Sequence, residues 1–198
     1  MRFTPRFMAK TALLAALAAF LMTLEIPLPF APSFYQIDLS EVPVLLGGFA
    51  LGPLAALCIE LLKNLLYLLF KGTITAGVGE LANFLIGLSL VLPASLFYRK
   101  KKSRKGALWS LLWGTLAMTI AGVVINYFVL LPAYSFFMGI PLSALVDMGS
   151  AVNSSITSLG TLVIFATLPF NLLKGALSSL ITLLLYKRVE KPLFEKVA

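Results

Sequence analysis

The stretch from Leu168 to Gly175, LPFNLLKG, decides how the rest of the chain is interpreted. It places an amide, Asn171, and an ammonium, Lys174, at the entrance of a segment that is otherwise typical of a membrane span. A lone lysine at the centre of a bilayer costs about 3 kcal/mol even on lenient scales, so such residues usually have a function. Because the two residues are three apart, they share one face of a helix. We interpret that face as the polar wall of a ligand pocket.

The composition predicts an integral membrane protein. Apolar residues make up 60% of the chain, charged residues only 12%, and the mean hydropathy is +0.97. An ordinary soluble domain has about 25% charged residues. A chain of 198 residues holds about six helical spans of about 20 residues each, with short connections and little else. We therefore expect a single all-α, polytopic transmembrane domain over residues 1–198, without a soluble catalytic domain.

The basic residues predict the orientation of the chain in the membrane. The formal net charge is +8, and most of the basic residues fall in three places that alternate with long apolar runs: Arg2, Arg6 and Lys10; Arg99 to Lys105; and Lys187, Arg188, Lys191 and Lys196. Basic loops are retained in the cytoplasm. The pattern thus predicts a multi-pass membrane protein with both termini on the cytoplasmic side. It indicates a lipid bilayer rather than a nucleic acid as the partner of these charges.

Apolar runs and helix breakers predict where the six spans lie. Their approximate bounds are 8–29, 42–52, 54–70, 81–98, 106–131 and 168–186. The second is short because Gly52 and Pro53 break the helix. We expect the region 132–166 outside, partly helical, with its apolar stretch 159–166 on or within the bundle. The N-terminal run continues to Phe30 without a clear cleavage site, so we expect it to be a span rather than a removed signal peptide.

The residue inventory argues against catalysis. The chain has no histidine and one cysteine, Cys58, so it offers neither a disulfide nor a metal site. It contains no G-x-x-x-x-G-K-[ST] phosphate loop. An intramembrane enzyme needs a nucleophile with a base, or paired acids, and the carboxylates are widely spread. We therefore predict a protein that is not an enzyme and has no catalytic cofactor or metal.

Two polar connectors are expected on the outer side. Residues 26–43 are rich in proline, contain no basic residue and include Tyr35, Gln36 and Asp38. A connector of this length suggests a lid over a pocket, although a solvated turn is the simpler alternative. Residues 71–83, KGTITAGVGELAN, carry Gly79 beside Glu80 and Asn83. Such glycines allow a backbone to approach a ligand closely, or serve only as a flexible connector.

The depth of three polar residues favours one cavity. At 1.5 Å per residue, Asn126 lies about 31 Å along its helix from Lys105, and Lys174 about 20 Å from Lys187. Asn171 lies about one turn further out than Lys174. All three thus reach the outer third to half of the bilayer. A pocket open to the outside explains this common level, whereas Asn126 alone is also explained by a hydrogen bond between packed helices.

Two further patterns have structural alternatives. Ala12 with Ala16, and Ala15 with Ala19, form small-xxx-small pairs in the first span. They predict either close packing inside the chain or a face for docking another protein. In the third span, Glu60 and Lys63 are spaced to neutralise each other across one helical turn, and Glu60 is the one carboxylate expected at mid-membrane.

In its ordered motifs the sequence resembles the membrane-embedded substrate-binding (S) components of energy-coupling factor (ECF) vitamin transporters, most closely the riboflavin-specific ones. The matching stretches run from Ala12 to Arg188 and comprise the alanine-rich first helix, IDLSEVPVLLGGFALGP, LLKNLLYLLF, GELANFLIG, NYFVLLP and LPFNLLKG. Each block is weak alone, whereas the ordered set is specific. The long segment between the fifth and sixth spans departs from the pattern we expect.

The resemblance implies how the site and the partners are arranged. Riboflavin would bind in an outward-facing pocket, and a transmembrane coupling protein (T component) with two ATP-binding-cassette ATPases would drive its import. The residues implied for the flavin are Asn126, Asn171, Lys174, Tyr35, Gln36, Ile37, Asp38, Leu39, Gly79, Glu80 and Asn83. Those implied for docking are Ala12, Ala15, Ala16 and Ala19.

Three other functions stay open at this point. An S component for another vitamin is one, and FMN as ligand is a second, because Lys71 is placed to meet a phosphate. The third is a stand-alone secondary transporter, which would normally show inverted repeats or acidic relays.

Overall fold

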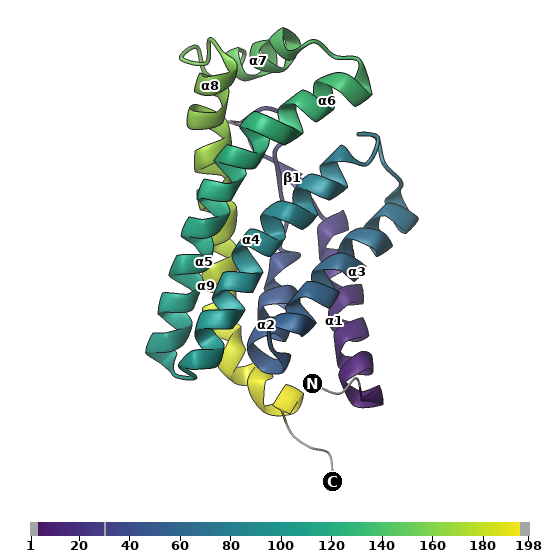
Figure 1. Cartoon of the computed structure of the whole chain (residues 1–198), viewed down its shortest axis with the longest axis vertical. Coiled ribbons are helices and arrows are strands. Elements are labelled where there is room, and N and C mark those ends of the chain that lie inside the picture. The colour runs from purple at the N-terminus through teal and green to yellow at the C-terminus, as the bar shows by residue number, and fades with distance from the viewer. Residues whose placement is uncertain (1–3, 30, 195–198) are drawn as a thin grey trace.

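The computed structural model of the chain describes residues 4–29 and 31–194, with side chains as far as residue 189. Helices form an elongated bundle, and the first helix begins at the same end of the bundle at which the last helix finishes (Figure 1). In chain order the helices are α1 (Pro5–Thr23), α2 (Glu41–Leu51), α3 (Pro53–Lys71), α4 (Val78–Lys100), α5 (Arg104–Ile125), the π-helical η1 (Asn126–Leu130), α6 (Leu131–Met138), α7 (Leu142–Ser150), α8 (Leu159–Leu162), the π-helical η2 (Val163–Thr167) and α9 (Leu168–Phe194). Arg2, Phe30 and Lys196, for which we made predictions, lie outside the described residues, as does the side chain of Lys191.

The all-α, polytopic fold is confirmed. Within the described residues, five helical runs are long and apolar enough to cross a membrane: Pro5–Thr23, Pro53–Lys71, Val78–Lys100, Arg104–Met138 and Leu159–Val189. The helix α2 has only 11 residues, which gives a length of about 16 Å, roughly half of the hydrocarbon thickness. Its residues from Glu41 to Ala50 are all buried, because α1, α3, α4 and α9 pack around it.

The break between α2 and α3 follows from local chemistry. Gly52 adopts a φ of 101°, in the region that favours glycine, and Pro53 opens α3 in the first turn. The chain therefore reverses within one residue, and α3 returns along α2. The predicted break at these two residues is where α2 ends.

The last two long helices differ from the prediction at their outer ends. The fifth continues past Pro132 to Met138, and the last begins at Leu159 rather than at Leu168 or Pro169. Each proline follows a π-helical segment by two residues, Pro132 after η1 and Pro169 after η2. A π-helical turn is wider than an α-helical one and rearranges the hydrogen bonds that a proline would otherwise break. The helix can therefore continue through a residue that normally marks its boundary.

The first connector is more ordered than a free loop. The helix α1 ends at Thr23 rather than near residue 29, and the strand β1 (Ile26–Pro27) pairs antiparallel with β2 (Gln36–Ile37). Ile26 lies opposite Ile37, and Pro27 opposite Gln36. This pairing holds residues 31–40 against the bundle, where Tyr35 is 7% exposed.

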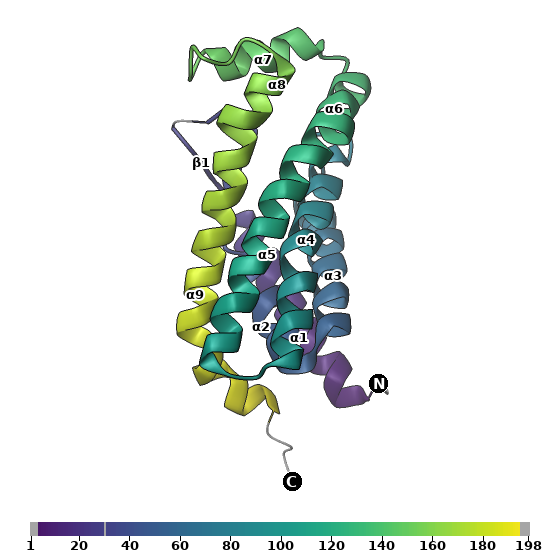
Figure 2. The same ribbon diagram turned by 60° about the vertical axis from the view of Figure 1, so that its left-hand side comes forward.

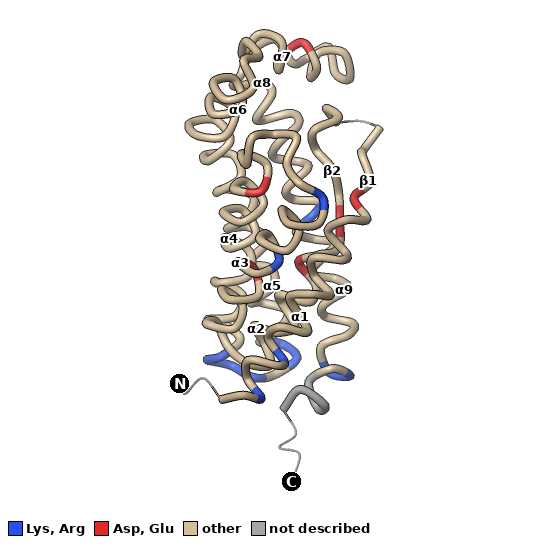
Figure 3. Tube along the Cα trace, turned by 90° about the vertical axis from the view of Figure 1, so that its right-hand side faces the viewer, with Lys and Arg blue, Asp and Glu red and all other residues tan. Residues whose placement is uncertain are grey.

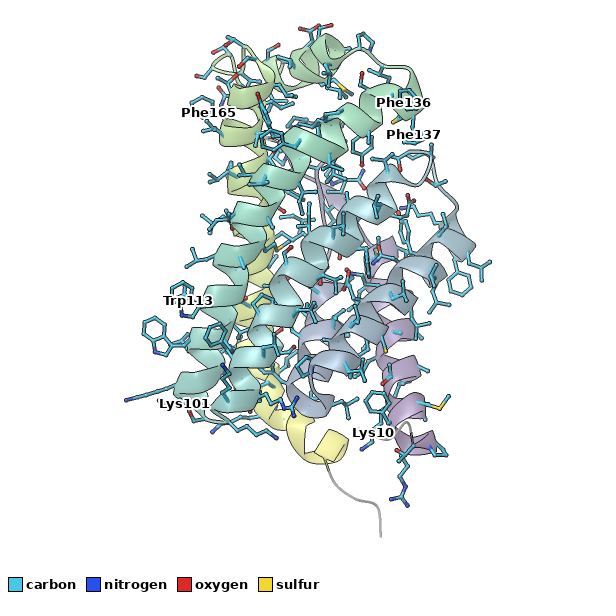
Figure 4. The ribbon with its side chains drawn as sticks, viewed as in Figure 1. Lys10, Lys101, Trp113, Phe136, Phe137 and Phe165 are labelled. Atoms are coloured by element: carbon cyan, nitrogen blue, oxygen red, sulfur yellow. The ribbon has the colours of Figure 1, made fainter. Side chains whose placement is uncertain are left out.

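The side chains separate a lipid-facing exterior from an inner and an outer core. Trp113 and Phe165 point away from the bundle, and Phe136 and Phe137 project from α6 near the far end (Figure 4). The inner core lies among α1, α2, α3, α4, α5 and α9, and the outer core joins the first connector to α6, α7, α8, η2 and α9. At the end opposite the termini, α7 lies across the bundle (Figure 2). The expected external segment is thus a helical cap between the last two long helices.

Candidate functional site

One face of the last long helix carries a buried polar stripe. Thr167, Asn171 and Lys174 follow each other at the spacing i, i+4, i+7, which places them on one face. Their exposed fractions are 0%, 1% and 6%, so the stripe faces the interior rather than lipid. An ammonium at such a position needs a partner, because an unpaired buried charge is costly.

Asp38 of the first connector is the partner of Lys174. Lys174 Nζ donates to Asp38 Oδ2 at 2.8 Å, and the two side chains are 7% and 3% exposed. The backbone N–H of Ser40 donates to the other carboxylate oxygen of Asp38 at 2.7 Å. Burial alone raises the pKa of the Asp38 carboxyl, but the positive charges of Lys174 and Lys63 outweigh burial and hold this pKa below its usual value. The ion pair therefore ties the connector to α9.

Tyr35 joins the two long helices at the level of η1 and η2. Its hydroxyl donates to Asn126 Oδ1 at 3.4 Å and shares a short hydrogen bond with Thr167 Oγ1. Its ring stacks on Phe170 with the ring centroids 4.8 Å apart and the planes at 28°. Burial raises the pKa of the Tyr35 hydroxyl, so this group keeps its proton.

Both asparagines lie beside Gly122 of α5. Asn126 Nδ2 donates to the carbonyl of Gly122 at 2.8 Å. A side chain at Gly122 would place its Cβ 2.4 Å from Asn171 Nδ2, so glycine is needed there for the amide of Asn171 to fit. Asn171 Nδ2 donates to the carbonyl of Thr167. Among the described residues, no group donates to Asn171 Oδ1, which is buried and thus an available acceptor.

The other predicted residues of the first connector contact different neighbours. Ile37 is packed against the outer core and Leu39 against the inner core. The side-chain amide of Gln36 faces the carboxylate of Glu25, and with its oxygen and nitrogen exchanged the amide nitrogen would donate to the two carboxylate oxygens at 2.9 and 3.0 Å. The side chains of Ile37 and Leu39 thus point toward the bundle, while that of Gln36 points toward Glu25.

The second connector reaches the same outer region from α4. The backbone N–H of Gly79 donates to Thr75 Oγ1, and Glu80 accepts hydrogen bonds from the hydroxyls of Thr73 and Thr75. A Cβ at Gly79 would lie 3.1 Å from the hydroxyl of Tyr134. Gly79 and Glu80 therefore begin α4 beside α6, close to the outer core.

Asn83 belongs to a separate ionic cluster. Its Oδ1 accepts from Lys63 Nζ at 3.3 Å. Lys63 also pairs with Glu41 Oε1 at 2.8 Å and with Glu60 Oε1 at 2.7 Å, and all three charged side chains are 0% exposed. The predicted Glu60–Lys63 pair is confirmed, whereas the role of Glu41 was missed. Glu41 directly precedes the apolar run from Val42 to Leu51, and a carboxylate at the start of such a run is the signal that points to a buried partner.

Lys71 is held by a neighbour. It pairs with Glu25, which also accepts from the hydroxyl of Tyr67. The Lys71 side chain is 43% exposed. A phosphate at this position would have to compete with an existing carboxylate.

The four alanines of α1 fall on two different faces. Ala15 and Ala19 are 0% and 2% exposed and pack inside the chain. Ala12 and Ala16 are exposed, on the outer face of the bundle. Only this second pair is available to a partner protein, so Ala15 and Ala19 pack within the chain rather than forming part of a docking face.

Thr167 and Phe170 belong to the candidate site, and sequence reasoning missed both. Both lie within or directly before LPFNLLKG, and Thr167 is four residues before Asn171. The spacing alone would have placed Thr167 on the polar face. The contact of both residues with Tyr35, more than 130 residues away in sequence, has no local signal.

The sequence model of one family, "ECF transporter, substrate-specific component", matches residues 6–186. The Riboflavin transporter FmnP of Bacillus subtilis is 36% identical over 186 residues, which cover 93% of this chain and 92% of that protein. The Riboflavin transporter RibU of Staphylococcus aureus is 36% identical over 178 residues, covering 90% and 87%. A solved structure described as "Structure and mechanism of the S component of a bacterial ECF transporter" has a TM-score of 0.73 and 34% identity, and covers 96% of this chain and 98% of its own.

Proposed function

This chain belongs to the substrate-specific components of ECF transporters, and we propose from that premise and from the site that it captures riboflavin. The family consists of transporter components, so the chain is not an enzyme. Two relatives of 36% identity are named as riboflavin transporters. We further infer which atoms of the chain hold the vitamin.

The main support for the proposal is the available acceptor atom Asn171 Oδ1. The pyrimidine edge of the isoalloxazine ring presents an N–H donor between two carbonyl acceptors. Asn171 Oδ1 is buried and has no donor among the described residues, so it suits that N–H. Lys174 and an amide N–H of Asn126 are donors for the two carbonyls. A flat heterocycle of this kind thus satisfies the polar groups that converge here.

The apolar part of the ring also finds a matching surface. Tyr35 and Phe170 are stacked and buried beside the asparagines, and aromatic faces favour offset stacking with a further planar ring. Ile37 and Leu39 lie in the same connector. The ribityl hydroxyls would meet the polar groups of the outer connectors, Gln36 and Glu80, near the backbone of Gly79.

Binding requires the first connector to exchange its contacts. Tyr35 bonds to Asn126 and Asp38 holds Lys174, so ligand carbonyls must replace or share these partners. Residues 31–40 therefore act as a lid that is fixed by the same side chains that hold the ligand. Closure of the lid over the vitamin is therefore coupled to the contacts that the vitamin makes with these side chains.

The transport step depends on partners. We place the protein in the bacterial cytoplasmic membrane with its basic end inside, in agreement with the concentration of Lys and Arg at the end of the bundle where the chain termini lie (Figure 3). A T component with two ATP-binding-cassette ATPases would supply the energy. The exposed Ala12 and Ala16 face of α1 would dock on the T component, because small residues permit close helix approach.

The alternatives are less well supported. FMN needs a cation for its phosphate, and Lys71 is already paired with Glu25. A stand-alone secondary transporter does not agree with the family of the chain. An S component for another vitamin is tested together with the leading proposal.

The test is a fluorescence titration of purified protein with riboflavin, FMN, thiamine and biotin in parallel. The proposal predicts saturable quenching of riboflavin fluorescence at one site per chain, with FMN binding more weakly. Thiamine and biotin, added in excess, should not compete. Quenching that is absent, or that thiamine or biotin abolishes, would overturn the assignment of riboflavin.

A further inference from the structure

A cavity of about 360 Å³ lies at the basic end of the bundle, far from the riboflavin site. The residues that line it belong to the α2–α3 turn and to the end of α4 with its following loop: Gly48, Phe49, Ala50, Leu51, Gly52, Arg99 and Lys102. Its walls are thus mainly apolar, and the charged side chains among the described residues that line it are those of Arg99 and Lys102.

The helices beside this cavity are closely packed. The ring of Phe49 stacks on Tyr98 with centroids 4.1 Å apart and planes at 15°. Gly48 lies so close to α4 that a Cβ there would be 2.0 Å from Ser95 Oγ. The end of α2 is therefore packed tightly against α4 beside the cavity.

The electrostatics of the cavity favour an anion. Arg99 is in the last turn of α4, and Lys102 is in the loop that follows. None of the described residues that line the cavity is acidic. The helix α3 begins at Pro53, directly after the lining residue Gly52, so the positive end of its dipole adds to the same field.

Aromatic side chains show that the cavity lies at the level of lipid headgroups. Trp109 and Trp113 are 58% and 50% exposed, and Phe97 stacks on Trp113 with centroids 6.5 Å apart. Exposed tryptophans of this kind mark the interface between the hydrocarbon and the headgroups. Trp113 points outward from the bundle close to the end that carries Lys101 (Figure 4). Phe97 itself is only two residues before Arg99.

We propose that this cavity binds the phosphate headgroup of an anionic phospholipid. Arg99 and Lys102 would hold the phosphate, because basic groups near a membrane surface attract anionic lipids and basic pockets between transmembrane helices bind their headgroups. The acyl chains would continue along the exposed side chains of Leu96 and Phe97. A lipid explains both features of the site, cations inside the cavity and apolar residues beside it, whereas a soluble phosphate would use only the first.

Native mass spectrometry of the full chain in detergent tests this proposal with added phosphatidylglycerol or phosphatidylcholine. The variant Arg99→Gln/Lys102→Gln should bind phosphatidylglycerol about 25-fold more weakly, from about fivefold for each cation. Its control is Lys100→Gln/Lys105→Gln, which removes the same charge from exposed residues of the same segment that do not line the cavity. The control should change the affinity by no more than about twofold.

Three results would overturn the proposal. The first is equal weakening in both variants, which would indicate attraction to the loop as a whole. The second is equal retention of phosphatidylcholine and phosphatidylglycerol by the wild-type chain. The third is displacement of the bound lipid by inorganic phosphate at equal concentration, which would identify a soluble phosphate as the ligand. A thermal unfolding measurement in the same detergent checks that both variants are folded.

Discussion

Replacing Lys174 by methionine should separate the stability of the bundle from its affinity for riboflavin. The Lys174 ammonium lies 2.8 Å from the Asp38 carboxylate, with both side chains almost fully buried. Removing one partner of such a pair leaves a buried charge, which costs about 3–5 kcal/mol of stability. It also removes a charged hydrogen bond to a ligand carbonyl, worth about 1.5–3 kcal/mol. The dissociation constant for riboflavin should therefore rise about 10- to 150-fold.

The double variant Lys174→Met/Asp38→Asn distinguishes the two effects. It removes both charges, so most of the lost stability should return. The affinity should stay low, because the donor to the ligand is still missing. The single variant Asp38→Asn keeps Lys174 and should bind riboflavin within a few-fold of the wild type.

The assay is a fluorescence-quenching titration at fixed detergent, paired with a thermal melt of each variant. The reasoning would be refuted if the double variant bound riboflavin as tightly as the wild type. It would equally be refuted if Asp38→Asn lost affinity as strongly as Lys174→Met, since the carboxylate would then be the ligand-binding group.

Three further predictions concern the acceptor, the docking face and pH. Asn171→Leu removes the available acceptor at nearly constant volume. Because one hydrogen bond is worth about 1–2 kcal/mol, riboflavin binding should weaken about 5- to 30-fold in the same titration. Unchanged affinity would exclude the amide from the site. Ala12→Leu/Ala16→Leu should abolish cellular riboflavin uptake and leave riboflavin binding by the purified chain intact. The control Ala12→Ser/Ala16→Ser should retain uptake. If the leucine variant also retained uptake, the docking face would lie elsewhere. The ion pair of Asp38 contributes stability above the unfolded pKa of about 4, because its folded pKa is lowered. The difference in melting temperature between wild type and Asp38→Asn should therefore be constant from about pH 8 to 4 and shrink below that, and a decline already at neutral pH would contradict the pairing.

The parts of the fold that could be predicted are those set by local chemistry. Apolar runs locate the helices, and Gly52 with Pro53 ends α2 because few other residues adopt that backbone. The polar stripe of α9 follows from the spacing of Asn171 and Lys174. In each case a few neighbouring residues contain the whole physical cause.

The parts that could not be predicted depend on distant or compensating interactions. Pro132 and Pro169 lie inside helices because π-helical turns precede them, and proline alone indicates the opposite. Asp38 is 136 residues from its partner Lys174, so only the tertiary structure shows the pair. Ala15 is buried and Ala16 exposed because of the way α1 is rotated against α3. The small-xxx-small spacing does not determine that rotation.

A structure of the chain with riboflavin bound tests the central claim most directly. The account predicts that the ring N–H between the two carbonyls donates to Asn171 Oδ1, with Lys174 Nζ released from Asp38 or shared between Asp38 and a ring carbonyl. It also predicts Asn126 at the same edge of the ring. A flavin bound elsewhere, with Lys174 still paired only to Asp38 and Asn171 Oδ1 still without a donor, would contradict it.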